Sequence, residues 1–242
     1  MQFTIDVAIA KTHKYASRES GDTAEVIERP AGGLTLLVVD GQGSGRSARV
    51  ISQMLVARAI GMIKDGIRDG VVARAANDVL LGYRHGQVSA TLGMVSVDLP
   101  VDEVIVTHHG GTIGVARTSR GVELLRSESP PLGRYRLSRP EIWRFPIEPE
   151  ALVIVTSDGI SGSGQRVGQP ALDLCAYVAS LPAAATARAV ADGLLAEAIR
   201  RDTGKPADDC TVGVVRIGPA ADDIGIRTMT VHLPVDSTVR PA

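Results

Sequence analysis

The sequence predicts an α+β fold in which two stacked antiparallel sheets are covered on both outer faces by helices. Three observations support this prediction. Strand-like segments outnumber helical ones, short turns of the kind found in antiparallel hairpins join the strands in the middle of the chain, and the helical segments fall in two separate blocks. The expected architecture has four layers in the order αββα, a central antiparallel β-sandwich flanked by helix pairs.

The first part of the chain contains three predicted strands followed by two consecutive helices. Phe3–Ala10 alternates apolar and polar residues, Ala24–Glu28 is a second candidate strand, and Leu34–Val39 is a branched apolar run typical of a buried strand. Apolar residues spaced by three and four then predict helices at Arg46–Ile67 and Val71–Tyr83. Two helices in succession do not fit a repeating βαβ pattern.

The rest of the chain predicts a β-rich middle and a second helical block. Short turns at 100–102, 110–111 and 120–121 separate the middle strands and favour antiparallel pairing. The predicted strands are Ser89–Leu99, Glu103–His108, Thr112–Thr118, Val122–Arg126, Ile142–Phe145 and Leu152–Val155, the helices are Pro170–Leu181 and Ala184–Arg201, and a last strand is Thr211–Ile217.

Length and the lack of a linker predict one folded domain over residues 1–220. Residues 221–242 form a predicted C-terminal extension, with a candidate added strand at Ile226–Leu233 and a loose tail after it.

The composition excludes several classes of protein. Apolar residues make up 44% of the 242 residues and charged residues 22%, as in an ordinary globular domain, and a net charge of −1 argues against binding nucleic acid through bulk positive charge. No apolar run approaches the roughly 20 residues of a membrane helix, and the N-terminus lacks a signal-peptide pattern. Cys175 and Cys210 belong to no CxxC pair, so we expect reduced thiols in a cytoplasmic protein with no membrane association.

Acidic residues stand at the edges of several predicted strands. Asp40-Gly41 follows one buried run, Asp158-Gly159 follows another, Asp208-Asp209 precedes a third, and Asp22 precedes a fourth. Carboxylates beside buried strands are costly unless they are paired, hydrogen-bonded or bound to metal, and hard cations such as Mg²⁺ or Mn²⁺ prefer oxygen ligands. The alternative is that each Asp-Gly pair is an ordinary turn, because sequence alone does not bring the acids together in space.

Two other patterns suggest different sites. Gly43–Ala48 matches GxGxxA after a strand and before a helix, as in a dinucleotide-binding turn, but that fold requires a parallel strand after the helix, and a second helix follows here. His108 and His109 resemble a metal pair. Adjacent strand residues face opposite sides, so we expect one imidazole to be buried and the other solvated.

Six short motifs occur in a fixed order from about residue 20 to residue 217: Ser20-Gly21-Asp22, Val39–Gly45, Ser89-Ala90-Thr91, Gly110-Gly111, Thr156–Gly159 and Asp208–Thr211. Each is weak alone, but the ordered set resembles the metal-dependent protein serine/threonine phosphatases, the PPM or type-2C family. The match is closest to the SpoIIE-like branch and its short stand-alone stress-response members. The resemblance implies a central β-sandwich flanked by helix pairs, in agreement with the element order.

The resemblance also implies two divalent cations, Mn²⁺ or Mg²⁺, at one end of the sandwich. By position, Asp40 would bridge both ions, the Gly41 carbonyl would bind one, and Asp158 and Asp208 would complete the other, with Asp22 supporting the second ion directly or through water. Asp40 and Asp158 would be the catalytic residues that position the metal-bound water. Such a metal pair activates water near neutral pH and offsets the charge of the phosphate.

The chain departs from the family pattern at three places. Gln42 stands where many relatives carry His, a candidate acid for the leaving group, and Gly21 stands where others carry Glu. Asp209 falls where many relatives have Asn, so we expect Asp209, like Gln42, to support the metal ligands without touching the ions. Arg18 is the nearest candidate for a phosphate-binding residue.

By resemblance, the substrate is phosphoserine or phosphothreonine on a partner protein. The SpoIIE-like branch suggests a STAS-domain antagonist of an anti-sigma factor, or a stressosome component, and no nucleic-acid partner. Two alternatives stay open: a catalytically weak or silent relative that binds a phosphoprotein through the same surface, and a nucleotide-binding protein that uses residues 43–48.

Overall fold

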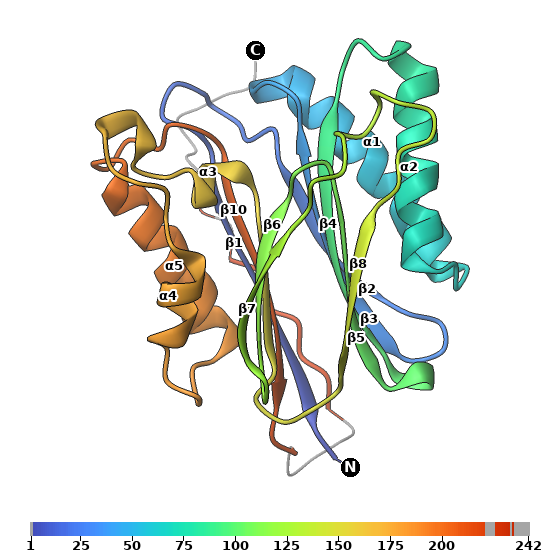
Figure 1. Ribbon diagram of the computed structural model, residues 1–242, viewed down its shortest axis with the longest axis vertical. Helices are drawn as coiled ribbons and strands as arrows, with labels where there is room; N and C mark the ends of the chain where they lie inside the picture. The colour runs from blue at the N-terminus through green and yellow to red at the C-terminus, as the bar shows by residue number, and fades with distance from the viewer. Residues whose placement is uncertain (1, 221–225, 233, 235–242) are drawn as a thin grey trace.

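Two five-stranded sheets stacked face to face form the centre of the computed structural model (Figure 1). The structure describes residues 2–220, 226–232 and 234. All pairs of neighbouring strands in the two sheets are antiparallel. Sheet A has the order β1 (Thr4–Thr12), β10 (Cys210–Gly218), β9 (Leu152–Thr156), β6 (Ile113–Thr118) and β7 (Gly121–Arg126), and sheet B has the order β2 (Thr23–Glu28), β3 (Gly33–Gly41), β4 (Ala90–Asp98), β5 (Glu103–His109) and β8 (Glu141–Pro146).

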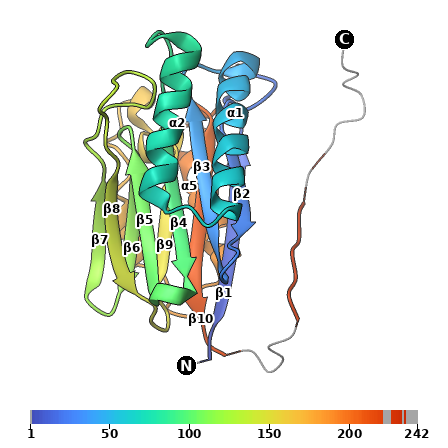
Figure 2. The same cartoon turned by 90° about the vertical axis from the view of Figure 1, so that its right-hand side faces the viewer.

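Helices cover the outer face of each sheet. Helices α1 (Gly45–Lys64) and α2 (Asp69–Arg84) pack on sheet B, as Figure 2 shows, and α4 (Leu174–Ala179) and α5 (Ala187–Arg201) lie over sheet A. A single helical turn, α3 (Asp158–Ser161), follows β9. The predicted αββα architecture is therefore confirmed, and the all-antiparallel sheets exclude the dinucleotide-binding fold suggested by residues 43–48.

The central strands are buried on both faces, which explains their continuous apolar sequences. In β3, Leu36 and Val38 face the core between the sheets, whereas Leu37 and Val39 face α1 and α2. Strand β9 divides its residues between the sandwich core and the α5 side in the same way. Because each fully buried aliphatic side chain contributes about 1.5–3 kcal/mol, a one-residue slip of either strand would disturb two cores at once.

Two helical predictions need correction. The helix predicted over Pro170–Leu181 is confined to Leu174–Ala179. It begins at Leu174 because the Asp173 side chain accepts a hydrogen bond from the Ala176 N–H at 2.9 Å and caps the helix there. The helical turn α3 was not predicted at all. Its four residues are too few for a periodic apolar pattern to be visible in the sequence.

The prediction for the histidine pair was wrong in one respect. His108 and His109 do face opposite sides of β5, but both are fully buried. His108 lies edge-to-face against Trp143, with ring centroids 5.3 Å apart, and His109 Nε2 lies 2.5 Å from Ser138 Oγ under the β7–β8 connection. Burial lowers the pKa of each imidazole to about 4, so both are neutral at pH 7.

The C-terminal extension does not add the candidate strand within its described part. Residues 226–232 form neither helix nor strand, Leu233 lies outside the described residues, and so does the whole of the predicted tail, residues 235–242. We propose that the folded domain ends near residue 220, after β10. Among the described residues, no helix has the length and apolar character needed to cross a membrane.

One buried ion pair joins three elements of the sheet B side. Arg29, directly after β2, places Nη1 2.8 Å from Asp69 Oδ1 at the start of α2 and Nη2 3.5 Å from Asp98 Oδ2 at the end of β4. Arg29 Nη1 also donates to Thr35 Oγ1 at 2.9 Å. The side chains of Arg29 and Asp69 are only 7% and 2% exposed, so removing either one would leave the charge of the other buried and uncompensated.

We expect Arg29→Met to lower the free energy of unfolding by about 3–5 kcal/mol, because it leaves the Asp69 carboxylate buried without its cation. The measurement is urea unfolding at neutral pH. Arg188→Met is the matched control: it breaks an exposed pair with Asp192, and we expect a loss of about 1 kcal/mol or less. Equal losses in the two variants would show that the buried Arg29–Asp69 pair contributes no more to stability than an exposed pair.

Candidate metal centre

Three predicted carboxylates meet at one end of the sandwich. Asp40 lies at the end of β3 in sheet B, whereas Asp158 follows β9 and Asp208 precedes β10 in sheet A. The pairing of Val212 with Thr156 places the start of β10 beside the end of β9. A pocket of about 220 Å³ opens there, and Asp40, Asp158 and Asp208 all line it.

The glycine of each Asp-Gly pair is required by close packing rather than by a turn. A Cβ on Gly41 would lie 2.3 Å from the Ala48 carbonyl oxygen of α1, and a Cβ on Gly159 would lie 2.2 Å from the Asp209 carbonyl oxygen. Neither glycine has a positive φ. The turn interpretation therefore does not account for these pairs, since in both cases the backbone of a neighbouring element occupies the space of a side chain.

Asp22 and Asp40 occupy the most unfavourable electrostatic positions in the cluster. Burial, together with the negative charges of Asp22, Asp158 and Asp208, raises the pKa of Asp40 to about 9. Burial raises the pKa of Asp22 to about 6, against a hydrogen bond of 2.6 Å from Thr211 Oγ1 to its Oδ2. The other oxygen, Asp22 Oδ1, is buried and receives no hydrogen bond from any described protein group.

Asp158 and Asp208 lie at the open side of the pocket. Asp158 is exposed, yet burial of its surroundings and the charge of Asp208 raise its pKa. Asp208 Oδ1 accepts the Asp209 N–H at 2.9 Å. Ser157 joins the two strand ends, because its Oγ donates to the Asp209 carbonyl at 3.1 Å and accepts the Thr211 N–H at 2.9 Å.

The carboxylates surround the pocket without closing on a single point. Within the described part of the chain, no three His, Cys, Asp or Glu side chains converge tightly enough to enclose an ion, although the neighbouring negative charges add to burial in raising the pKa of Asp40. The two findings agree because Coulomb repulsion acts over a longer range than a coordination bond. The buried Asp22 Oδ1 and an oxygen-only donor set, with neither His nor Cys in the pocket wall, fit hard cations such as Mg²⁺ or Mn²⁺.

Asp209 holds the loop that carries Asp22. Its Oδ1 accepts the Lys14 N–H at 2.9 Å, and its Oδ2 accepts the Gly21 N–H at 2.8 Å. A Cβ on Gly21 would lie 2.6 Å from the Ala48 Cβ, which explains why this position has no larger side chain. Asp209 thus positions Asp22 from behind the cluster.

Gln42 closes the turn between β3 and α1 onto the start of β4. Its Oε1 accepts the Ser89 N–H at 2.8 Å and lies 3.0 Å from Ser89 Oγ, and its own N–H donates to the Ser89 carbonyl at 2.9 Å. Gln42 also lines the carboxylate pocket. Arg18, in contrast, is exposed on the β1–β2 loop and lines neither this pocket nor the groove beside it.

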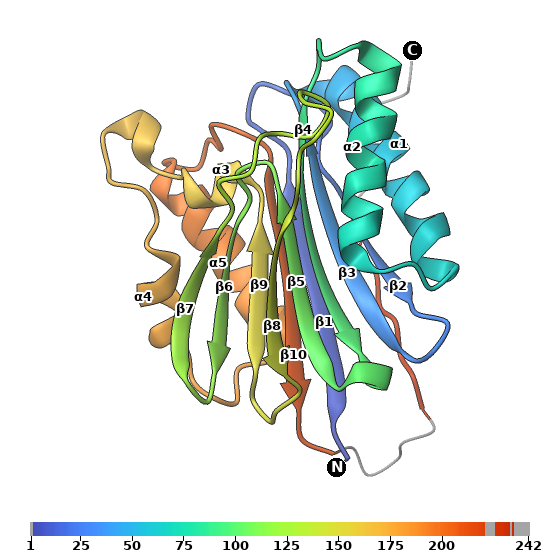
Figure 3. The ribbon, with the colours of Figure 1, turned by 45° about the vertical axis from the view of Figure 1, so that its right-hand side comes forward.

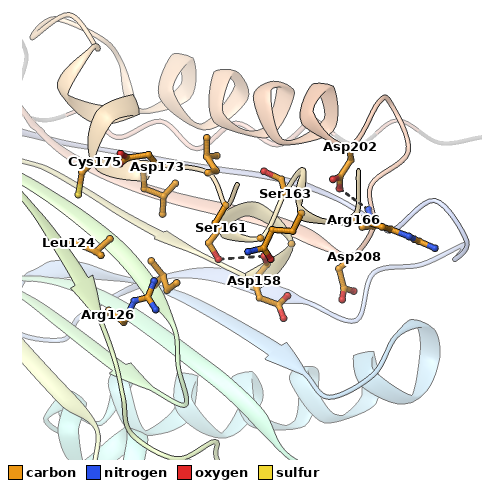
Figure 4. Close-up of a pocket in the computed structure, with 18 residues that line it drawn as sticks. Leu124, Arg126, Asp158, Ser161, Ser163, Arg166, Asp173, Cys175, Asp202 and Asp208 are labelled. Carbon is orange, nitrogen blue, oxygen red and sulfur yellow. Dashed lines mark hydrogen bonds between the residues drawn. The ribbon is translucent and has the colours of Figure 1, made fainter. Parts of the chain in front are cut away.

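A larger groove of about 700 Å³ adjoins the carboxylates and contains basic residues that the sequence did not reveal. Figure 4 shows Asp158 and Asp208 among its lining residues, together with Arg126 of β7 and Arg166 of the 3₁₀ turn Gln165–Val167. No local motif marks either arginine. The one available signal is register, since Arg126 pairs with Ile113 and Ile113 pairs with Thr156 beside the acidic cluster.

Comparison with known proteins settles the family. The family model described as Stage II sporulation protein E (SpoIIE) matches residues 30–218. The chain belongs to the SpoIIE family. This membership confirms the resemblance drawn from the six ordered motifs.

Members of the SpoIIE family and related phosphatases share its architecture. Stage II sporulation protein E of Priestia megaterium is 23% identical over 215 residues, which cover 89% of this chain and 37% of that protein. The structure of the PP2C phosphatase domain and a regulatory fragment of SpoIIE from Bacillus subtilis has a TM-score of 0.77 at 23% identity and covers 89% of this chain and 64% of that one. RsbX in complex with magnesium has a TM-score of 0.66 at 15% identity and covers 90% and 99%. The fold is thus the PP2C fold, and the chain spans about a third of the length of the curated relatives it matches.

The raised carboxylate pKa values predict a pH-dependent stability for the metal-free protein. Asp40 and Asp22, with pKa values of about 9 and about 6, bind protons in the folded state that an unfolded aspartate releases near pH 4. Their stabilising contribution is complete below about pH 4 and is lost as the pH rises toward about 9. In EDTA, we therefore expect the free energy of unfolding to fall between about pH 5 and about pH 8.

Asp40→Asn tests this expectation by urea unfolding at the two pH values. Because asparagine cannot ionise, the free energy of unfolding of the variant should fall less between the two pH values. At the higher pH the variant should be more stable than the natural chain by on the order of 2 kcal/mol. Glu123→Gln, at an exposed position on β7, is the control and should leave the fall unchanged. A fall of the original size in Asp40→Asn would contradict the assignment.

The hydrogen bonds of Asp209 predict a graded response to substitution. Asp209→Ala removes both acceptors of the 13–22 loop and should cost about 2–4 kcal/mol, with faster hydrogen exchange at Lys14 and Gly21. Asp209→Asn keeps one acceptor oxygen and should lie between the alanine variant and the natural chain. The measurements are urea unfolding and amide exchange, and unchanged exchange at both amides would refute the role of Asp209.

Proposed function

We propose that this chain is a metal-dependent phosphatase that hydrolyses phosphoserine or phosphothreonine on a partner protein. The observation that carries the proposal is the set of carboxylates gathered at one pocket. Asp40, Asp158 and Asp208 come from three separate segments and line the pocket, whose wall contains no Lys or Arg of the described chain, and Asp22 is close enough for its charge to raise the pKa of Asp40. The PP2C fold and SpoIIE family membership support the same activity.

In this proposal two divalent cations, Mn²⁺ or Mg²⁺, are held by Asp22, Asp40, Asp158, Asp208 and the Gly41 carbonyl. When bound, they supply water activation and neutralise phosphate charge. The carboxylates must lose their protons to act as ligands, so binding at neutral pH releases the proton that Asp40, with a pKa of about 9, otherwise holds. Asp40 and Asp158 then orient the attacking water between the two sheets.

The surrounding residues keep this ligand set in place. Thr211 fixes one oxygen of Asp22 and leaves the other free for a cation. Asp209 and Gln42 hold the loops on either side of the pocket, and neither needs to touch an ion for this role. Gln42 cannot serve as the acid for the leaving group, since an amide has no proton to transfer at neutral pH.

Phosphate binding has three candidates in the chain. Arg18 is the residue proposed from the sequence, and its loop is the one that carries Asp22. Arg126 and Arg166 line the groove that shares Asp158 and Asp208 with the site, so they can meet the polypeptide on either side of a phosphorylated residue. Guanidinium groups suit this task because they bind phosphate oxygens in pairs.

The partner class follows from the SpoIIE-like resemblance. We infer that the substrate is a phosphorylated STAS-domain protein, either an antagonist of an anti-sigma factor or a stressosome component. Capture of partners on the immobilised chain, followed by assay of a phosphorylated STAS-domain protein, tests this inference. A chain that hydrolyses phosphoserine peptides but neither captures nor dephosphorylates a STAS-domain protein would refute it. We also propose a cytoplasmic location, which the two free cysteines support.

A second function is a catalytically silent binder of the same phosphoprotein. The occupation of the usual histidine position by Gln42, whose side chain is committed to Ser89, favours this alternative. Metal titration by calorimetry separates the two. A chain that binds Mn²⁺ and a phosphopeptide without turnover would be a binder, whereas turnover excludes that function.

We expect hydrolysis of p-nitrophenyl phosphate and of a phosphoserine peptide with Mn²⁺ or Mg²⁺, and none with EDTA. Asp40→Asn and Asp158→Asn should lower kcat/KM at least about 100-fold, because each removes a charge that holds the ions against the reacting phosphate. Circular dichroism should show that both variants remain folded.

Glu123→Gln is the control, since it removes an exposed carboxylate distant in sequence from the cluster. Its kcat/KM should match the natural chain within about twofold. Full activity of Asp40→Asn, or activity that survives EDTA, would contradict the proposed mechanism.

A further inference from the structure

The β7–β8 connection, residues 127–140, passes from sheet A to sheet B at the carboxylate end of the molecule (Figure 3). Pro131 in this connection lines the carboxylate pocket beside Thr91. The next residue, Leu132, is fully buried and exchanges two backbone hydrogen bonds with Ala90, of 2.9 and 3.3 Å. The connection therefore forms part of the rim of the site.

Polar contacts hold this connection at three points, Gly133, Tyr135 and Ser138. The Asn77 carboxamide of α2 accepts the Gly133 N–H at 2.9 Å and donates to the Tyr135 carbonyl at 3.0 Å. Further along, Ser138 Oγ lies 2.5 Å from His109 Nε2. A segment held at these points presents its outward side chains in a defined arrangement.

The outward side chains combine positive charge with large apolar groups. Leu137 is 90% exposed and Tyr135 is 63% exposed, and three arginines lie beside them. A single exposed leucine is ordinary on a protein surface, but Arg and Tyr are the residues most enriched at the centres of protein interfaces. We call this set the arginine loop, and its members are Arg134, Tyr135, Arg136, Leu137 and Arg139, all exposed.

The arginine loop has positive charge that the described chain does not neutralise. Arg136 and Arg139 make no hydrogen bond or ion pair with a described residue, and the side chain of Arg134 is bonded only to the Gly86 carbonyl, at 2.9 Å. The nearest acids in sequence are Glu128 and Glu141, and neither forms an ion pair with these arginines among the described residues; Glu141 Oε1 accepts the Glu128 backbone N–H at 2.8 Å. The net charge of the whole chain is −1, so this cluster is a local concentration.

We propose that the arginine loop docks an acidic, partly apolar surface of the phosphoprotein substrate while its phosphoserine occupies the carboxylate pocket. This inference rests on the proposed function and adds the surface chemistry of the substrate. Charge complementarity requires an acidic partner face, and Leu137 requires an apolar contact on it. Attachment to the pocket rim through Pro131 and Leu132 favours the substrate protein over a nucleic acid or an anionic lipid surface.

The test compares two phosphoserine peptides of equal length. One carries four glutamates and a leucine after a Gly-Ser spacer, the other carries glutamines in place of the glutamates, and the spacer is varied from short to long. At low salt with Mn²⁺, we expect the natural chain to prefer the acidic peptide about tenfold in kcat/KM. Arg136→Glu/Arg139→Glu should abolish that preference, and Leu137→Ser should reduce it several-fold.

Arg120→Glu is the matched control. Arg120 is exposed in the β6–β7 turn next to the Thr118–Gly121 pair, at the opposite end of β6 from the residue that pairs beside Asp158. This variant should keep the tenfold preference. A preference that is absent in the natural chain, or unchanged in the double arginine variant, would overturn the proposal.

A binding readout separates this proposal from the proposed function. If no variant hydrolyses either peptide, the phosphatase assignment fails. Fluorescence anisotropy of the labelled acidic peptide in EDTA still tests the loop: binding lost in Arg136→Glu/Arg139→Glu and kept in Arg120→Glu supports it. Stronger binding of a uridine oligonucleotide or of phosphatidylserine vesicles than of the acidic peptide would overturn the choice of a protein partner.

Discussion

Repulsion among aspartates held at one end of the sandwich is the constraint on which the rest of the site depends. Strands β3 and β9, which end beside Asp40 and Asp158, cannot move apart to reduce this repulsion. Each packs against a helix layer on one face and against the opposite sheet on the other. Gly41 and Gly159, next to these aspartates, also restrict movement, because the backbone of a neighbouring element occupies the position that a Cβ atom would take. The stable core of the protein is therefore used to maintain an arrangement that is electrostatically unfavourable without cations.

The same architecture explains why the sequence predicted the fold so well. Strands buried on both faces produce short, continuous runs of branched residues, and the Leu34–Val39 run stands out even without alternation. The two failures have different causes. Asp173 starts α4 late through a local cap, whereas His109 is covered by a distant connection that no local pattern places above it.

The residues of the candidate site also fall into two groups, those that the sequence identified and those that it did not. The acidic motifs could be found because each occupies a strand end, and strand ends of one sandwich edge meet in space. The arginines of the groove and of the β7–β8 connection lie in segments whose local sequence has no recognisable motif. Arg126 and the arginine loop lie where the chain crosses from sheet A to sheet B, and Arg166 lies in the turn after α3, so their positions depend on topology rather than on residue spacing.

The contact between the two ends of the domain has a consequence for biosynthesis. Strand β1 pairs with β10 along its whole length, Lys14 and Gly21 are bonded to Asp209, and Asp22 is bonded to Thr211. Residues at the start of this domain thus receive their final partners from residues made near its end. In a nascent chain that has not released β10 from the ribosome, Asp22 lacks its bond to Thr211, and Asp208 lacks the strand that places it beside Asp158. The proposed metal site is consequently complete only once β10 inserts between β1 and β9.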